Sequence, residues 1–66
     1  MEIQKRLKPY VGGLVMIKDK VLTLESAEED HLVLMDEDHL HAFIQLTSIK
    51  EVYELDGKIP EIILKP

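Results

Sequence analysis

The stretch from Asp36 to Phe43, DEDHLHAF, joins three carboxylates to two histidines. His39 and His41 are spaced i, i+2, and together with Asp36 they are the candidate metal ligands of this chain. Zinc accepts imidazole and carboxylate ligands, but recognisable histidine sites use an i, i+4 pair on a helix or ligands from several elements. A single H-x-H pattern lacks that specificity. The favoured interpretation is therefore a charged hairpin turn that holds no metal.

The pairing register of the two flanking segments, HLVLM and HAFIQL, decides whether the histidines can meet. If the loop between them is residues 36–38, His31 lies opposite Phe43, and His31 and His41 are diagonal neighbours about 7–8 Å apart. If the loop is two residues longer, His31 lies opposite Gln45, and the two histidines are separated by about 13 Å along the strand. The sequence leaves both registers open.

Other residue patterns that carry catalysis are missing from the sequence. It has no cysteine, no H-E-x-x-H, no recognisable Ser-His-acid arrangement and no phosphate-binding glycine loop. The carboxylates of Glu28, Glu29 and Asp30 fall in a turn-like segment where nothing would desolvate them. A 66-residue chain also has little room for a closed pocket within one subunit. We therefore predict a protein that is not an enzyme and needs no cofactor.

The elements that position these residues are short strands separated by small turns. The segment EIQKRLK predicts a short amphipathic helix that ends at Pro9. The turn-like segments are KDK, AEED, DEDHL, the two-residue break TS and DGK, with Gly12 and Gly13 as a hinge before the first strand. We expect an all-β domain: a bent antiparallel sheet or barrel of five to six strands after a short N-terminal helix. The predicted strands are residues 14–17, 21–26, 31–35, 41–46, 49–55 and 59–64.

The length of 66 residues predicts a single domain, residues 1–66. A domain of this size buries only about 60% of the surface of its unfolded chain, so its stability is marginal. Small domains gain stability from disulfides, metals or partner subunits, and cysteine is absent. We therefore expect a homo-oligomer. The N-terminus has no apolar signal region, and no apolar run is long enough for a membrane span. We expect a cytoplasmic protein, in the host cytoplasm if it is viral.

Charge is unevenly distributed along the chain. Residues 1–20 carry five Lys or Arg and two acids, a net charge of +3. Residues 21–40 carry seven acids and no base, and residues 41–66 carry three bases and four acids. These segments sum to +3 − 7 − 1, the net charge of −5. Binding to nucleic acid depends on Lys and Arg that neutralise phosphates, so this balance argues against a nucleic-acid partner.

One face of the predicted hairpin carries exposed apolar side chains. Side chains alternate across a sheet, so Val33, Met35, His41 and Phe43 share the face opposite the core. Monomers rarely expose a contiguous apolar patch. Either the sheet curls into a barrel that buries both faces, so that the patch belongs to the core, or the patch is an interface with another subunit or a partner. The small size of the domain favours the interface. The C-terminal strand EIILKP can pair with a sheet edge, which adds two more interface residues. The predicted interface is Val33, Met35, His41, Phe43, Ile62 and Leu64, and the predicted core face of the hairpin is Leu32, Leu34, Ala42, Ile44 and Leu46.

The order of these elements resembles the Sm-like (Hfq-like) small barrel. The resemblance covers about residues 2–55 and rests on the helix EIQKRLK, the glycines of VGG, the strand pattern and the short break before Ile49 and Val52. It implies a bent five-stranded barrel, rings formed by edge-strand pairing and, in many members, RNA binding. Thr23 stands where the family has a mid-strand glycine, and the RNA-contacting Asn and Arg-Gly residues have no counterparts. The resemblance therefore implies the fold without the RNA site.

These observations favour a non-enzymatic, oligomeric small β-domain that binds a protein, such as a viral inhibitor or a bacterial accessory protein. One alternative is a protein that sequesters a small molecule or metal between subunits near His39 and His41. A second alternative is an Sm-like RNA-binding protein, which would bind RNA in a salt-sensitive manner.

Overall fold

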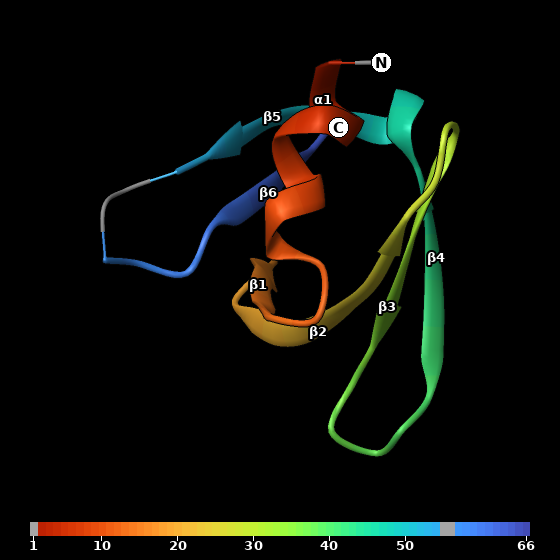
Figure 1. The fold of residues 1–66 in the computed structure, drawn as a ribbon, viewed down its shortest axis with the longest axis vertical. Coiled ribbons are helices and arrows are strands. Elements are labelled where there is room, and N and C mark those ends of the chain that lie inside the picture. The colour runs from red at the N-terminus through yellow and green to blue at the C-terminus, as the bar shows by residue number, and fades with distance from the viewer. Residues whose placement is uncertain (1, 55–56) are drawn as a thin grey trace.

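The computed structural model describes residues 2–54 and 57–66 and consists mainly of β-strands (Figure 1). The predicted helix forms, and the strands at 14–17 and 31–35 have the predicted bounds. The predicted end of the fifth strand, Leu55, lies outside the described residues. The elements are α1 (Glu2–Leu7), the 3-10 turn η1 (Lys8–Tyr10), β1 (Leu14–Ile17), β2 (Lys20–Ala27), β3 (His31–Met35), β4 (His41–Gln45), the 3-10 turn η2 (Leu46–Ser48), β5 (Ile49–Tyr53) and β6 (Glu61–Leu64).

The strands form one sheet in the order β4-β3-β2-β1-β6-β5. The sheet is not closed, since β4 and β5 lie at its two ends. Four of the pairings are antiparallel, but β1 and β6 are parallel, with Ile17 beside Ile62. The mainly β fold with a short N-terminal helix is therefore confirmed, whereas the wholly antiparallel arrangement is corrected to a mixed sheet. β6 pairs antiparallel with β5 on one side and parallel with β1 on the other.

The long strand β2 bends the sheet around its core. Residues 20–23 pair with β1, and residues 23–27 pair with β3. The β2–β3 register shifts between Leu24 and Ser26, which marks a bulge, and a bulge bends a strand and increases its twist. The backbone N–H of Gly12 donates to the carbonyl of Leu24 at 2.8 Å. Gly12 has a φ of 90°, a value that side-chain-bearing residues rarely adopt. The segment that leads into β1 is thereby joined to β2 where β2 bends.

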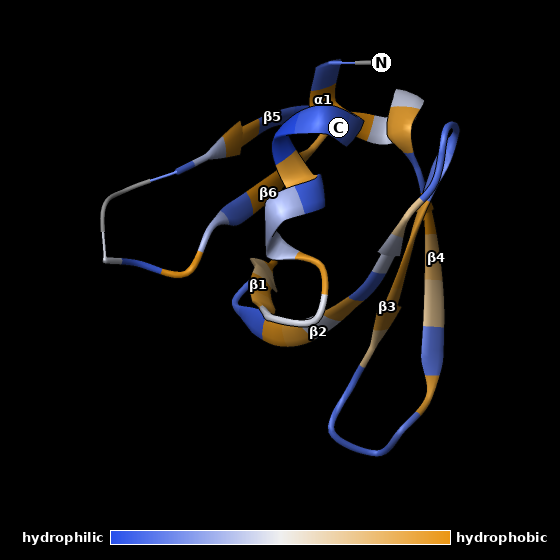
Figure 2. Ribbon diagram, in the orientation of Figure 1, coloured by the Kyte–Doolittle hydropathy of each residue, from blue (hydrophilic) through white to orange (hydrophobic). Residues whose placement is uncertain are grey.

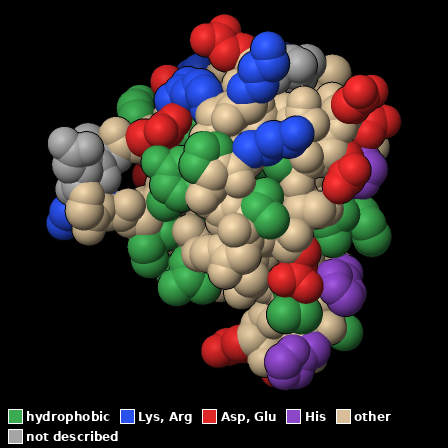
Figure 3. Space-filling model, in the orientation of Figure 1, with side chains coloured by type: hydrophobic (Ala, Val, Ile, Leu, Met, Phe, Trp, Pro, Cys, Tyr) green, Lys and Arg blue, Asp and Glu red, His purple; other side chains and the backbone are tan. Residues whose placement is uncertain are grey.

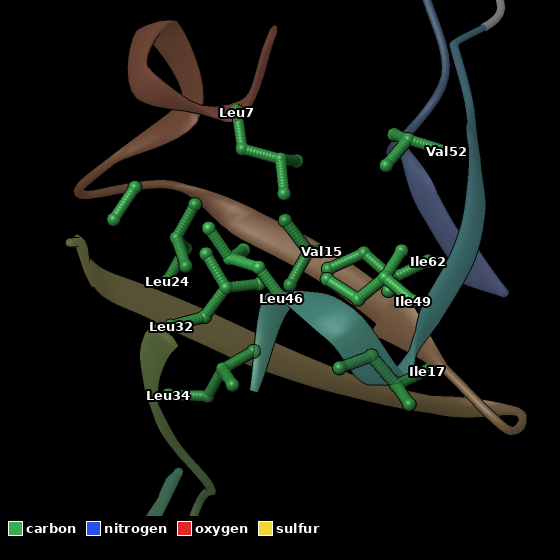
Figure 4. Packing of buried hydrophobic residues seen from close by; sticks show 11 residues of the cluster. Leu7, Val15, Ile17, Leu24, Leu32, Leu34, Leu46, Ile49, Val52 and Ile62 are labelled. Carbon is green, nitrogen blue, oxygen red and sulfur yellow. The ribbon is translucent and has the colours of Figure 1, made fainter. Parts of the chain in front are cut away.

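Apolar residues of α1, β1, β2, β3, η2, β5 and β6 fill the core, and Ile44 of β4 packs partly against it (Figure 4). Leu7 of α1 is fully buried, so the helix covers this core rather than standing apart from it. Strands β1, β3 and β6 consist mostly of apolar residues (Figure 2), and in β1 and β3 buried positions alternate with partly or fully exposed ones. Full burial of such a side chain contributes about 1.5–3 kcal/mol. The buried residues are Leu7, Val15, Ile17, Leu24, Ala27, Leu32, Leu34, Leu46, Ile49, Val52 and Ile62.

The turn between β1 and β2 contains only Lys18 and Asp19, because Ile17 pairs directly with Lys20. Both turn residues have positive φ, 49° and 67°. Two-residue hairpin loops with positive φ at both positions are type I′ turns, which match the twist of the flanking strands. The predicted charged turn KDK is confirmed as this tight connection.

Candidate functional site

The β3–β4 register is the longer-loop alternative. His31 lies opposite Gln45, and His41 lies opposite Met35. The two histidines are therefore four residues apart along the hairpin, a distance of about 13 Å. Among residues 2–54 and 57–66, no group of three His, Cys, Asp or Glu side chains is arranged to hold a metal ion. Asp36, His39 and His41 thus do not converge on a common point.

The Asp36 carboxylate instead organises the hairpin loop. Its Oδ1 accepts the backbone N–H of Asp38 at 2.9 Å and that of Leu40 at 3.0 Å. The carbonyl of Asp36 accepts the N–H of His39 at 3.0 Å, and the N–H of Asp36 donates to the carbonyl of Leu40 at 3.0 Å. His39 has a φ of 63°, the left-handed conformation in which His is enriched. These contacts give Asp36 and His39 structural roles in the turn.

Each of the other two histidines lies beside a carboxylate. His31 Nδ1 is 2.7 Å from Asp30 Oδ1, and this hydrogen bond holds the pKa of Asp30 below its usual value of 3.8. The His31 ring also lies 6.1 Å from the ring of Phe43, centroid to centroid. His41 Nε2 is 3.9 Å from Glu25 Oε1. His31 therefore contacts both a carboxylate and the exposed ring of Phe43, whereas the recorded partner of His41 is Glu25.

The face of β3 and β4 that points away from the core, here called the outer face, carries Val33, Met35, His41 and Phe43. Val33 lies opposite Phe43, and Met35 lies opposite His41. The Phe43 side chain is 68% exposed, while Val33 and Met35 are half-buried. Leu32 and Leu34 are fully buried on the other face. The predicted division of β3 side chains between the two faces is confirmed.

The core assignment in β4 needs a correction. Leu46 is buried and Ile44 packs partly against the core, but Ala42 is exposed. The loop end of the β3–β4 hairpin extends past the body of the molecule (Figure 1). Ala42 lies in that extended part, so no second layer covers it.

Two residues of the predicted interface lie inside the sheet. Ile62 is only 1% exposed, and Leu64 packs partly against the core. Their strand β6 lies between β1 and β5, so it is not an edge strand. Pro60 directly precedes this strand, and its carbonyl accepts the N–H of Met16 at 2.9 Å. Proline lacks the N–H that a strand interior needs, and it is tolerated here because it lies before the first residue of β6.

The outer face continues onto β2 and β1, which the sequence-based interface did not include. Thr23 pairs with Met35 on one side and with Leu14 on the other. Leu14 is 50% exposed and Val21 is 46% exposed. The alternation of β1, in which Val15 and Ile17 are buried, could have indicated that Leu14 faces outward.

An open hollow of about 560 Å³ lies where the β1–β2 turn faces the β3–β4 loop. Carboxylates of both turns line it, and Ala42 borders it on the side of β4. Its lining combines carboxylates, which can bind a cation, with exposed apolar side chains. The lining residues are Asp19, Lys20, Val21, Leu22, Asp36, Glu37, Asp38, Leu40, His41 and Ala42.

Comparison of this chain with known proteins found no match among family models, curated proteins or solved structures. The Sm-like relationship therefore stays a prediction. Within residues 2–54 and 57–66, no helix is able to span a lipid bilayer.

Proposed function

We propose that this chain is a non-enzymatic protein-binding module and that the outer face of β3 and β4 is its recognition surface. The observation that carries the proposal is the exposure of Phe43, which projects beside Val33 in the middle of a paired strand. Aromatic side chains and Met are enriched in protein interfaces, where a few such residues supply most of the binding energy. Phe43 is the central contact in this proposal.

The folding energetics support the same interpretation. The fully buried Leu32 and Leu34 stabilise the hairpin, whereas Phe43 gains little from a position that leaves most of its surface in water. Contact with a partner would remove that apolar surface from water. The surrounding carboxylates would form a polar rim, as is usual for an interface.

Affinity capture tests the proposal with three versions of the immobilised protein: wild type, Phe43→Ser and Val11→Ser. Val11 is 43% exposed and lies before β1, outside the outer face, so its replacement is a matched control. We expect a protein that is retained by the wild type and Val11→Ser and lost with Phe43→Ser. Equal retention by all three versions would contradict the proposal.

The expected homo-oligomer is a separate proposal, supported by the small size of the domain and the lack of cysteine. Light scattering of the purified protein measures its mass directly. A mass above that of one 7.6 kDa chain is the expected result. A monomer at high micromolar concentration would contradict it.

A further inference from the structure

The strand β4 is an edge of the sheet with unpaired backbone groups. In an antiparallel pair, successive residues alternate between bonding to the neighbouring strand and facing away from it. The N–H of Asp36 donates to the carbonyl of Leu40, and the N–H of Leu46 donates to the carbonyl of Asp30. Leu40 and Leu46 thus bond toward β3. By the same alternation, the N–H and carbonyl groups of Ala42 and Ile44, which lie between them, also point toward β3. The N–H and carbonyl groups of His41, Phe43 and Gln45 then face the open side.

The opposite edge of the sheet, β5, is partly covered. Nη2 of Arg6 donates to the carbonyl of Val52 at 2.9 Å. The same guanidinium is held by Glu54, with Nε 2.8 Å from Oε1. Covering an edge strand with a side chain from a neighbouring helix hinders the addition of a further strand. In the described part of the chain, β4 is the edge without such a cover.

The half of the molecule around β4 is strongly acidic. Residues 21–48 contain seven carboxylates and no Lys or Arg. In Figure 3, the hairpin at the bottom of the view carries acidic and histidine side chains, and Lys and Arg lie elsewhere on this face. The hollow borders Ala42, on the face of β4 opposite Phe43, and its lining carries the carboxylates of Asp19, Asp36, Glu37 and Asp38 against the single cation of Lys20. A strand added beside β4 would therefore have an apolar surface on one face and carboxylates on the other.

From this arrangement we infer that β4 accepts an extended basic segment of another protein as an additional strand. Alternate apolar residues of that segment lie beside Phe43, and its Lys or Arg residues face the hollow and its carboxylates. Backbone hydrogen bonds supply affinity in this mode of recognition, and alternate side chains supply specificity. The inference rests on the proposed protein-binding function and specifies the chemistry of the partner.

A second copy of the chain fits this edge less well. Pairing of β4 with another β4 would bring two acidic halves together, and opposed like charges weaken an interface. Pairing of β4 with the β5 edge of another copy would meet Arg6 at Val52. A basic strand from another protein neither repels the carboxylates around β4 nor meets Arg6.

Fluorescence anisotropy at low salt tests the inference with two labelled, end-blocked heptapeptides, one of alternating Lys and Val and the other of alternating Glu and Val. We expect the Lys-Val peptide to bind and the Glu-Val peptide not to bind. Affinity for the Lys-Val peptide should fall as salt is added, since screening weakens exposed charge pairs. Equal binding of the two peptides, or no binding of either, would overturn the inference.

The backbone contribution is tested with Gln45→Pro and its matched control Gln45→Ala. Gln45 has a φ of −68°, which proline adopts without strain. Proline removes one N–H from the open edge, whereas alanine keeps it. We expect Gln45→Pro to weaken peptide binding about fivefold, the effect of one hydrogen bond, and Gln45→Ala to leave it nearly unchanged. Circular dichroism checks that both variants are folded.

The Phe43→Ser variant separates this inference from the proposed function. If Phe43→Ser loses the peptide while Gln45→Pro binds it like the wild type, the outer face binds proteins but the edge does not accept a strand. The inference then fails and the proposed function stands. If Gln45→Pro instead lowers the mass of the protein in sedimentation without a change in peptide affinity, the edge is occupied by a second copy, and the inference also fails.

Discussion

Arg6 and Val52, 46 residues apart in the chain, are joined by a hydrogen bond of 2.9 Å from the guanidinium to the carbonyl of Val52. The same guanidinium pairs with Glu54, whose other carboxylate oxygen accepts the hydroxyl of Tyr10 at 3.1 Å. The N-terminal helix is thereby attached to the far edge of the sheet. This contact both holds the helix over the core and covers part of β5.

Replacement of Arg6 by Ala removes the bond to Val52 and the ion pair with Glu54. We expect a loss of about 1 kcal/mol in the free energy of unfolding, because both contacts are partly exposed. Urea denaturation measures the change. Lys5→Ala is the control, since Lys5 is an exposed residue of the same helix and its loss should matter by less than about 0.5 kcal/mol. Equal effects of the two substitutions would contradict the assigned role of Arg6.

Asp36→Ala should destabilise the protein by about 1–2 kcal/mol, because the N–H groups of Asp38 and Leu40 lose their shared acceptor. Asp36→Asn keeps an acceptor oxygen in place and should recover most of that loss. Thermal or urea unfolding provides the measurement. A metal-binding role predicts a different outcome, in which added zinc stabilises the wild type and the chelator EDTA reverses the effect.

Leu34 and Phe43 are on adjacent strands but should differ greatly in their contribution to folding. Leu34 is fully buried, and its replacement by Ala should cost about 2–5 kcal/mol. Phe43→Ala should change the free energy of unfolding by less than about 0.5 kcal/mol, because most of the ring is exposed. Urea denaturation of both variants tests this. A large loss with Phe43→Ala would mean that Phe43 serves folding rather than recognition.

The charge of Glu51 raises the pKa of Tyr53 above 10.0, with a smaller contribution from Glu61 on the paired strand. A raised pKa means that the fold favours the neutral phenol. The corresponding contribution to stability is complete below the unfolded pKa near 10 and is lost as the pH rises through the raised value. Ultraviolet titration of a Tyr10→Phe variant follows Tyr53 alone. The midpoint should move down with Glu51→Gln, and an unchanged midpoint would contradict the assignment.

The sequence by itself determined the strands at 14–17 and 31–35 and the burial of Leu32 and Leu34. These features depend on local alternation and on turn residues such as Lys18 and Asp19, which act over a few positions. The division of β3 into a core face and an outer face followed from the same alternation. The expectation of a mainly β domain after a short helix rested on these local signals.

Only the tertiary structure decided how the strands assemble. The two registers of the β3–β4 hairpin differ by two residues, so both keep every side chain on the same face and the apolar pattern cannot choose between them. The bonds of Asp36 in the loop accompany the longer register, which keeps His31 and His41 apart. The place of β6 beside β1, the exposure of Ala42 and the bond from Arg6 to Val52 depend on contacts between distant segments. Local sequence patterns contain no information on such contacts, and these contacts leave β4 as the open edge.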